Sequence, residues 1–249
     1  MVILKSLEEI EKIRKAGSVV ADVLGELRRQ VRPDISTLSL DEFAEQFIRA
    51  AGAKPAFKGY RGYPRTLCTS VNDQVIHGIP SKQVVLKEGD LLSIDVGALV
   101  DGFYGDAAVT VPVGAVRPEA QRLMRVTEEA LALGIAQAKP GNRLFDISSA
   151  IQRHVEQNGF SVVREFVGHG IGRSLHEDPQ VPNFGERGRG PRIQSGMVLA
   201  IEPMVNAGGS KTIVQDDHWT AVTADGSLSA HFEHTIAVLD DGPKVLTMR

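Results

Sequence analysis

Four carboxylates and one histidine occupy strand-like positions in this sequence. Asp95 follows the apolar run Leu-Leu-Ser-Ile, Glu202 ends a run of five apolar residues, and Glu233 lies in the middle of a β-branched and aromatic segment. A carboxylate in such a run is costly to bury unless it is paired or bound to a cation. In chain order, the complete set is Asp95, Asp106, His169, Glu202 and Glu233.

The two aspartates are expected to lie diagonally adjacent on one face of a hairpin. If Asp101 and Gly102 form a two-residue turn, Asp106 pairs with Gly97 on the returning strand. Asp95 and Gly97 share a face because strand side chains alternate, so the aspartates point the same way. Two like charges at that distance favour a cation between them, the alternative being a surface hairpin with two solvated acids.

Three histidines lie close to glycines or to expected strand ends. The segment 168–172 reads Gly-His-Gly-Ile-Gly, which predicts close backbone approach and a rigidly presented His169. His77 begins the turn His-Gly-Ile-Pro, and His176 follows seven residues after His169. A single histidine is more often structural than catalytic. The positions of these three, beside glycines or strand ends, only moderately favour a functional role.

Carboxylates combined with one imidazole predict an oxygen-rich metal site. Bridging acids suit two divalent cations about 3.5–4 Å apart, as in two-metal hydrolases, and the imidazole favours Mn, Fe, Co or Zn. Glu202 and Glu233 could instead be partners in buried salt bridges. The single cysteine, Cys68, excludes a thiolate zinc site and an internal disulfide, which predicts a cytoplasmic location.

Composition places few other constraints on function. The 249 residues include 28 Lys and Arg against 31 Asp and Glu, a net charge of −3. This balance gives no electrostatic case for specific nucleic-acid or anionic-membrane binding. No apolar run approaches the length of a membrane span, and the first residues lack a signal-peptide pattern.

Hydrophobic periodicity predicts the elements that must position these side chains. Capping-box patterns at Ser6 and Ser39 open two of the expected helices. The helices are expected at 6–31, 40–51, 118–138 and 144–157, and the strands at 91–96, 107–111 and 231–238. The last strand is expected to pair with residues 221–223 as a hairpin around Asp225 and Gly226. The Gly- and Arg-rich segment 183–191 is expected to be an exposed loop.

The second half of the chain repeats the order of the first. Gly52 and Gly159 are 107 positions apart, and the same offset brings the strand ending in Asp95 onto the one ending in Glu202. Chance similarity is the alternative. We predict one α+β domain, 1–249, whose halves 1–112 and 113–249 form a pseudo-twofold pair with helices outside a curved, largely antiparallel sheet.

The ordered ligand set resembles that of the pita-bread metallopeptidases. The phrases His-Gly-Ile-Pro at 77–80, Gly-His-Gly-Ile-Gly at 168–172 and Ile-Glu-Pro at 201–203 resemble the type I methionine aminopeptidases specifically. The resemblance covers nearly the whole chain. It implies the pita-bread fold and two divalent ions, Co, Mn, Fe or Zn, whose bridging hydroxide attacks the first peptide bond.

The resemblance also implies a role for each site residue. Asp95 and Asp106 would bind one metal, His169 and Glu202 the other, with Asp106 and Glu233 bridging. Glu202 would be the general base, His176 would stabilise the oxyanion, and His77 would contact the scissile nitrogen. The methionine pocket would contain Tyr60, Tyr63, Cys68, Leu175 and Trp219. Many relatives carry Phe where this chain has Leu175. A monovalent cation, Na or K, would lie near Asn72, Gln74 and Ser229.

The implied reaction is removal of the initiator methionine from nascent chains when the second residue is small, after deformylation. The implied protein is a monomer that meets the ribosome transiently. Two alternatives remain: another pita-bread peptidase, such as an Xaa-Pro aminopeptidase, and a non-catalytic binding protein of the same fold. The second should bind no divalent metal tightly.

Overall fold

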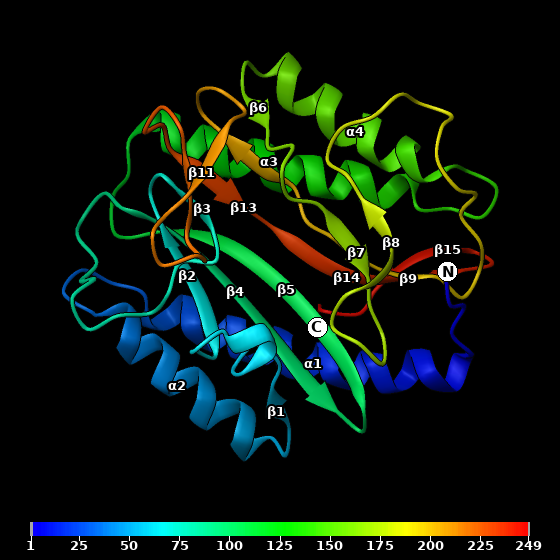
Figure 1. Ribbon diagram of the computed structural model, residues 1–249, viewed down its shortest axis with the longest axis horizontal. Coiled ribbons are helices and arrows are strands. Elements are labelled where there is room, and N and C mark those ends of the chain that lie inside the picture. The colour runs from blue at the N-terminus through cyan, green and yellow to red at the C-terminus, as the bar shows by residue number, and fades with distance from the viewer. Residues whose placement is uncertain (1, 249) are drawn as a thin grey trace.

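The helices lie in two pairs on the outside of the molecule. The computed structural model describes residues 2–248, so the predicted domain of 249 residues extends one residue further at each end. The α-helices in this range are α1 (Leu7–Gln30), α2 (Thr37–Ala50), α3 (Pro118–Gln137) and α4 (Leu144–Gln157). Figure 1 shows α1 with α2 along one side of the molecule and α3 with α4 along the other, with the strands between them.

Two serines determine where the first helices begin. The Ser6 side chain accepts a hydrogen bond from the backbone N–H of Glu9, and the Glu9 carboxylate accepts one from the Ser6 N–H, as the capping box predicts. The predicted start of the second helix at residue 40 is wrong by three residues. Ser36 caps α2 by accepting from the N–H of Ser39 at 3.2 Å, so Ser39 lies inside the helix.

One large antiparallel sheet carries the predicted site. Along the sheet the order is β1 (Lys54–Pro55), β4 (Leu91–Val100), β5 (Phe103–Pro112), β14 (Glu233–Leu239), β9 (Val198–Ile201), β7 (Gly168–Gly170) and β8 (Glu177–Val181). Strand β2 (Leu67–Val71) also pairs with β4, and β15 (Gly242–Val245) with β14. Gly97 pairs with Asp106, which confirms the predicted register of the β4–β5 hairpin.

Two three-stranded sheets complete the fold. One contains β6 (Ser161–Val162), β10 (Met204–Asn206) and β13 (Ser229–His231). The other contains β3 (Gln74–Ile76), β11 (Thr212–Val214) and β12 (Ala221–Thr223).

The predicted hairpin between 221–223 and 231–238 is therefore wrong, since β12 pairs with β3 and β11 while β14 pairs with β5, β9 and β15. Asp225 explains the difference, because its carboxylate accepts from the N–H groups of Gly209 and Ser227. These bonds turn the chain toward residues 207–209 instead of back onto β12.

The apolar faces of the helices pack on the sheet to form the main core. Val20 and Leu27 of α1 and Leu123 of α3 belong to the same buried cluster as Ile94 of β4. Helix α1 crosses β5 closely at one point, where a Cβ on Gly105 would lie 2.7 Å from the backbone nitrogen of Gly17. Glycine at this position lets the helix lie directly against the strand that carries Asp106.

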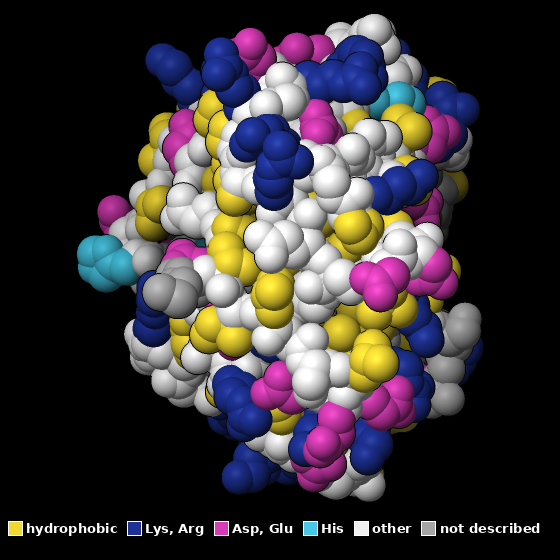
Figure 2. Space-filling view, turned by 90° about the vertical axis from the view of Figure 1, so that its right-hand side faces the viewer, with side chains coloured by type: hydrophobic (Ala, Val, Ile, Leu, Met, Phe, Trp, Pro, Cys, Tyr) yellow, Lys and Arg dark blue, Asp and Glu magenta, His cyan; other side chains and the backbone are white. Residues whose placement is uncertain are grey.

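The surface carries charges of both signs. Figure 2 shows Lys and Arg side chains interspersed with Asp and Glu on the face it presents, with hydrophobic side chains between them. Residues 186–189 of the Gly- and Arg-rich segment are exposed, but Asn183 at its start is buried, so the prediction of an exposed loop at 183–191 holds only for its middle part. Within residues 2–248, no helix combines the length and apolar character needed to cross a membrane.

A buried ion pair fixes the N-terminal segment to the sheet. The Lys5 Nζ lies 2.6 Å from the Glu177 Oε2, and the two side chains are only 3% and 9% exposed. Replacing Lys5 by Ala leaves the Glu177 carboxylate buried without its partner, so we expect a loss of about 3–5 kcal/mol in the free energy of unfolding. Denaturant unfolding measures this loss.

The exposed pair of Lys12 and Glu8, at 2.7 Å, provides the matched control. Lys12→Ala should cost less than about 1 kcal/mol because solvent screens that pair. Equal losses in the two variants would show that the burial of Lys5 has no energetic consequence.

Candidate functional site

Five neighbouring strands bring the five predicted metal-ligand side chains together. Asp95 lies on β4, Asp106 on β5, Glu233 at the start of β14, Glu202 directly after β9 and His169 on β7. These strands are consecutive neighbours in the large sheet. One residue from each strand therefore reaches the same place, although the five span residues 95 to 233 of the chain.

Several oxygens of these carboxylates are buried and have no hydrogen-bond partner. Asp106 and Glu233 are 4% and 2% exposed. Within the part of the chain that the structure describes, Asp95 Oδ1, Asp106 Oδ1 and Glu233 Oε1 are buried without a hydrogen-bond partner. Donor atoms of Asp106, His169 and Glu233 lie within 4.8 Å of one another. Unpaired oxygens converging with an imidazole fit a divalent cation site.

Burial and mutual repulsion disfavour the charged forms of these carboxyl groups. Burial raises the pKa of Asp95 to about 7 and that of Glu202 to about 8. For Asp106 and Glu233, burial and then the neighbouring carboxylates raise the pKa well above its ordinary value. A cation among these groups would offset both the desolvation and the repulsion.

His169 is held in the tautomer that a metal ligand needs. Its Nδ1 lies 2.8 Å from the carbonyl oxygen of Gly170, and because a carbonyl can only accept, Nδ1 carries the proton. Burial lowers the pKa of His169 to about 3, so the ring is neutral and the Nε2 keeps a free lone pair. The Nε2 points toward Glu202 Oε1 at 3.6 Å and Asp106 Oδ2 at 4.0 Å. Metal-ligating histidines typically use this backbone contact.

The glycines on either side of His169 allow this placement. A Cβ on Gly168 would lie 2.4 Å from the carbonyl oxygen of Ala200, and one on Gly170 would lie 2.1 Å from that of Asp178. No side chain fits at either position. The predicted close approach of the backbone at 168–172 is therefore present, between β7 and its two neighbours β9 and β8.

A cavity of about 170 Å³ opens onto the five side chains. Its lining also contains every residue predicted for catalysis and for the methionine pocket: Tyr60, Tyr63, Cys68, His77, Leu175, His176 and Trp219. Tyr63 and Trp219 meet edge to face, with ring centroids 5.0 Å apart. Aromatic and sulfur-containing walls surround one side of the cavity, and carboxylates form the other.

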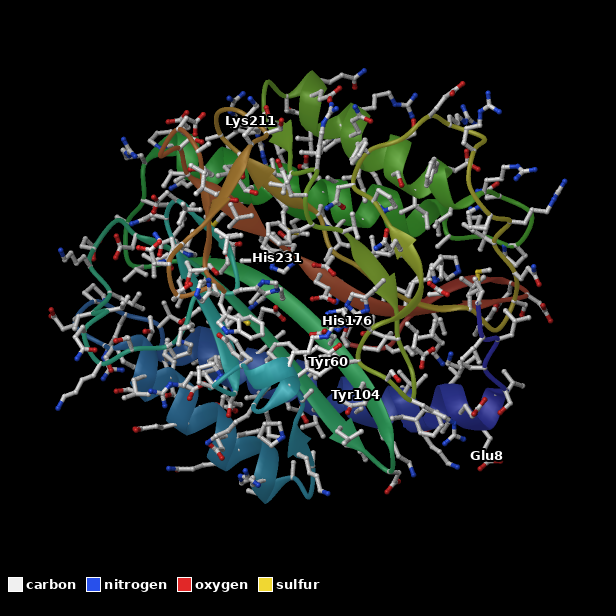
Figure 3. The ribbon with its side chains drawn as sticks, viewed as in Figure 1. Glu8, Tyr60, Tyr104, His176, Lys211 and His231 are labelled. Carbon is white, nitrogen blue, oxygen red and sulfur yellow. The ribbon has the colours of Figure 1, made fainter. Side chains whose placement is uncertain are left out.

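Two histidines line the same cavity as the carboxylate cluster. His176 Nδ1 lies 2.9 Å from the Tyr60 hydroxyl, and Figure 3 shows both residues near the centre of the molecule. His77 follows β3 with φ 61°, and its ring meets those of Phe166 and Trp219 edge to face. Burial lowers the pKa of His77 to about 4, so this ring is neutral at physiological pH.

Cys68 is part of the wall and not a reactive thiolate. It lies on β2, is 5% exposed, and pairs with Asp95 across the strands. Burial, followed by the charge of Asp95, raises the pKa of its thiol. A protonated thiol beside a carboxylate is neither a nucleophile nor a metal ligand, so Cys68 contributes its shape and polarisability.

Sequence reasoning missed three residues of this region. Phe57 and Arg61 line the cavity, and Phe57 supplies an aromatic surface to the pocket that contains Leu175. No pattern in the sequence indicated either residue. His231, with its Nε2 3.5 Å from Glu202 Oε2, was also missed. Its spacing of two from Glu233 was the available signal, because strand alternation places both on one face.

The residues predicted for a monovalent cation also lie close together. The Ser229 N–H donates to the Asn72 carbonyl at 2.8 Å, and the Gln74 side chain accepts from the N–H of Val71. This site stays a prediction.

A separate hollow of about 510 Å³ lies between α1, α3 and β14. It includes His234, which points away from the carboxylate cluster because it alternates with Glu233 along the strand.

The raised carboxyl pKa values predict how the stability of the metal-free protein depends on pH. The folded state holds protons on these groups that the unfolded chain has released, so stability is lost as pH rises through the folded pKa values. Above pH 7 the buried histidines are neutral in both states and contribute little. We expect the free energy of unfolding in chelator to fall by roughly 2 kcal/mol or more between pH 7 and pH 9.

Urea unfolding in chelator at the two pH values measures this change, and saturating Mn²⁺ should remove most of it. A flat profile in chelator would mean that the carboxylates are ionised in the metal-free fold.

Comparison with known proteins places the chain within a family. The model of metallopeptidase family M24 matches residues 11–240. A methionine aminopeptidase of Clostridium perfringens is 56% identical over 248 residues, covering 100% of this chain and 99% of that protein.

Solved structures agree with this result. The crystal structure of a methionine aminopeptidase from Thermotoga maritima matches with a TM-score of 0.99 and 49% identity, covering 100% of both chains. A prolidase from Pyrococcus furiosus matches with a TM-score of 0.78 and 23% identity, covering 99% of this chain and 66% of the prolidase. The second likeness concerns the fold alone. Together they confirm the predicted pita-bread architecture.

Proposed function

The chain belongs to metallopeptidase family M24, and from that membership we propose that it removes the N-terminal methionine from peptides and nascent proteins. It is a metal-dependent exopeptidase. One observation carries the proposal: the cavity that holds the five ligand-type side chains also holds the aromatic and thiol walls of a pocket for an unbranched thioether. Binding and bond cleavage can therefore occur in one place.

Two divalent ions, Co, Mn, Fe or Zn, fit the ligand set. Asp95 and Asp106 would hold one ion and His169 and Glu202 the other, with Asp106 and Glu233 bridging. The unpartnered oxygens and the fixed tautomer of His169 support this assignment. Bound ions supply Lewis acidity, which lowers the pKa of water and stabilises developing negative charge.

Three residues of the chain handle protons and charge during the reaction. Glu202 accepts a proton from the attacking water as general base. His176, held at Nδ1 by Tyr60, directs its Nε2 into the cavity and stabilises the oxygen of the scissile carbonyl as it becomes negative. His77 contacts the scissile amide nitrogen.

The pocket selects the first side chain of the substrate. Tyr63, Cys68 and Trp219 form an apolar surface that an unbranched thioether can fill. Leu175 lacks the aromatic ring that many relatives carry, but Phe57 lines the same cavity and restores an aromatic contact. We therefore expect methionine to remain the preferred first residue.

The setting of the reaction follows from its substrates. New chains carry an initiator methionine after deformylation, so we propose transient encounters with the ribosome in the cytoplasm. We also propose that the protein acts as a monomer. A Na or K ion near Asn72, Gln74 and Ser229 would stabilise the loops beside the site.

Metal reconstitution tests the proposed function. Metal-depleted protein is refilled with Co, Mn, Fe or Zn and given Met-Ala-Ser, Met-Lys-Ser and an Xaa-Pro peptide. We expect metal-dependent methionine release from Met-Ala-Ser alone. Cleavage of the Xaa-Pro peptide instead would favour a different M24 peptidase. Release of methionine with none of the metals, in a protein that stays folded, would contradict the proposal. If the protein then also bound no divalent metal tightly, that result would favour a non-catalytic binding protein.

A further inference from the structure

His231 is a buried histidine to which the proposed reaction gives no role. It ends strand β13 and is 2% exposed. Glu233 lies two residues further along the chain, and both residues direct their side chains toward the carboxylate cluster. Figure 3 labels both His231 and His176 near the centre of the molecule.

The Glu202 carboxylate lies between two imidazoles. Its Oε1 is 3.6 Å from the Nε2 of His169, and its Oε2 is 3.5 Å from the Nε2 of His231. The Nε2 of His231 has no hydrogen-bond partner within residues 2–248. A buried polar atom without a partner is destabilising, so a function in the metal-loaded site would explain its presence.

The backbone of His231 is firmly held. Its N–H donates to the Thr110 hydroxyl at 2.8 Å, and the same hydroxyl donates to its carbonyl oxygen. His231 also pairs with Met204 across β10 and β13. These bonds fix the backbone from which the ring projects, and a small movement of the Glu202 carboxylate would bring the 3.5 Å separation between the two side chains within hydrogen-bond range.

We infer that His231 is a positioning residue for Glu202. Its Nε2–H donates to Glu202 Oε2 and holds the carboxylate with Oε1 toward His169. His231 is not one of the five proposed ligands; its Nε2 lies 3.5 Å from the Oε2 of Glu202, to which it can donate. The inference rests on the proposed function, since it explains how the ligand and general base of that reaction is oriented.

Two substitutions test the inference. His231→Leu removes the donor, and His231→Gln keeps a neutral N–H donor on a side chain of similar reach. Titrating metal-depleted protein with Mn²⁺ in a calorimeter should show about 10- to 100-fold weaker binding for the Leu variant, as is usual when a partner of a metal ligand is lost. The kcat for Met-Ala-Ser should fall in parallel while KM changes less than about twofold. In the Gln variant, the Mn²⁺ affinity and the kcat should lie within about threefold of the values for the unsubstituted protein.

Stability of the metal-free protein separates positioning from a structural role. Because the Nε2 is unpartnered in the metal-free fold, His231→Leu should unfold at the same or a higher urea concentration than the unsubstituted protein in chelator. A clear loss of stability, unchanged Mn²⁺ affinity and kcat in the Leu variant, or a Gln variant no better than Leu would each overturn the inference. Failure of the unsubstituted protein to release methionine would overturn the proposed function instead, and the Mn²⁺ titration needs no peptide.

Discussion

Glu233→Gln should abolish most activity without destabilising the metal-free protein. Glu233 is the proposed bridging ligand, it is 2% exposed, and its Oε1 has no partner in the described structure. A neutral amide cannot balance the charge of two cations, so we expect kcat/KM for Met-Ala-Ser to fall about 10³-fold or more at saturating metal, equivalent to about 4 kcal/mol. In chelator at pH 8, urea unfolding should show equal or greater stability, because one repelling carboxylate has been removed.

Asp41→Ala is the matched control, because it removes a buried carboxylate that does have hydrogen-bond partners. Asp41 is also buried, but its Oδ1 accepts hydrogen bonds from the N–H groups of Thr66 and Leu67, both at 2.8 Å. Its loss leaves two buried donors unpaired, so stability should fall by about 2–3 kcal/mol while Mn²⁺ affinity is retained. If Glu233→Gln instead lost stability as Asp41→Ala does, Glu233 would be a structural carboxylate and not a ligand.

Local signals in the sequence were sufficient for the helices. The helix predicted at 144–157 is observed as Leu144–Gln157, and the one predicted at 118–138 ends one residue earlier. Capping explains both the success at Ser6 and the error at Ser39, since Ser36 offers the same side-chain oxygen three residues earlier. Periodicity identifies a helix, but neighbouring serines leave its first turn ambiguous.

Strand pairing was predictable only where the turn was short. The Asp101–Gly102 turn determined the register of β4 and β5, and from it the relation between Asp95 and Asp106. Strand β12 pairs with β11, which shortly precedes it, and with β3, which lies in the first half of the chain. No local pattern encodes such a choice.

The convergence of the carboxylates and His169 was more predictable than the contacts around them. A carboxylate in an apolar strand is conspicuous, and so is a histidine between glycines. Phe57 and Arg61 look like ordinary loop residues, and only the fold brings them to the cavity. His231 was visible in principle through its alternation with Glu233, but its significance depends on the position of Glu202, which lies on another strand.

His176→Ala should reduce turnover with little effect on metal or substrate binding. In the proposed reaction His176 acts only on the oxygen that becomes negative in the transition state, and losing such a donor costs about 10²–10³-fold in kcat. KM for Met-Ala-Ser should change less than about threefold, because the pocket walls are intact. Mn²⁺ affinity should be unchanged, because His176 is not a proposed ligand.

Tyr60→Phe is the matched control for this prediction, because it keeps the pocket ring and removes only the hydroxyl that lies 2.9 Å from His176 Nδ1. The imidazole then loses its fixed orientation but remains available, so kcat should fall about tenfold, equivalent to about 1.4 kcal/mol, with KM unchanged. A rise in KM without a fall in kcat, in either variant, would mean that His176 and Tyr60 bind the ground state and do not act on the transition state. We therefore expect the larger fall in kcat for His176→Ala, because His176 contacts the reacting carbonyl. The smaller fall for Tyr60→Phe would show that Tyr60 acts by orienting His176.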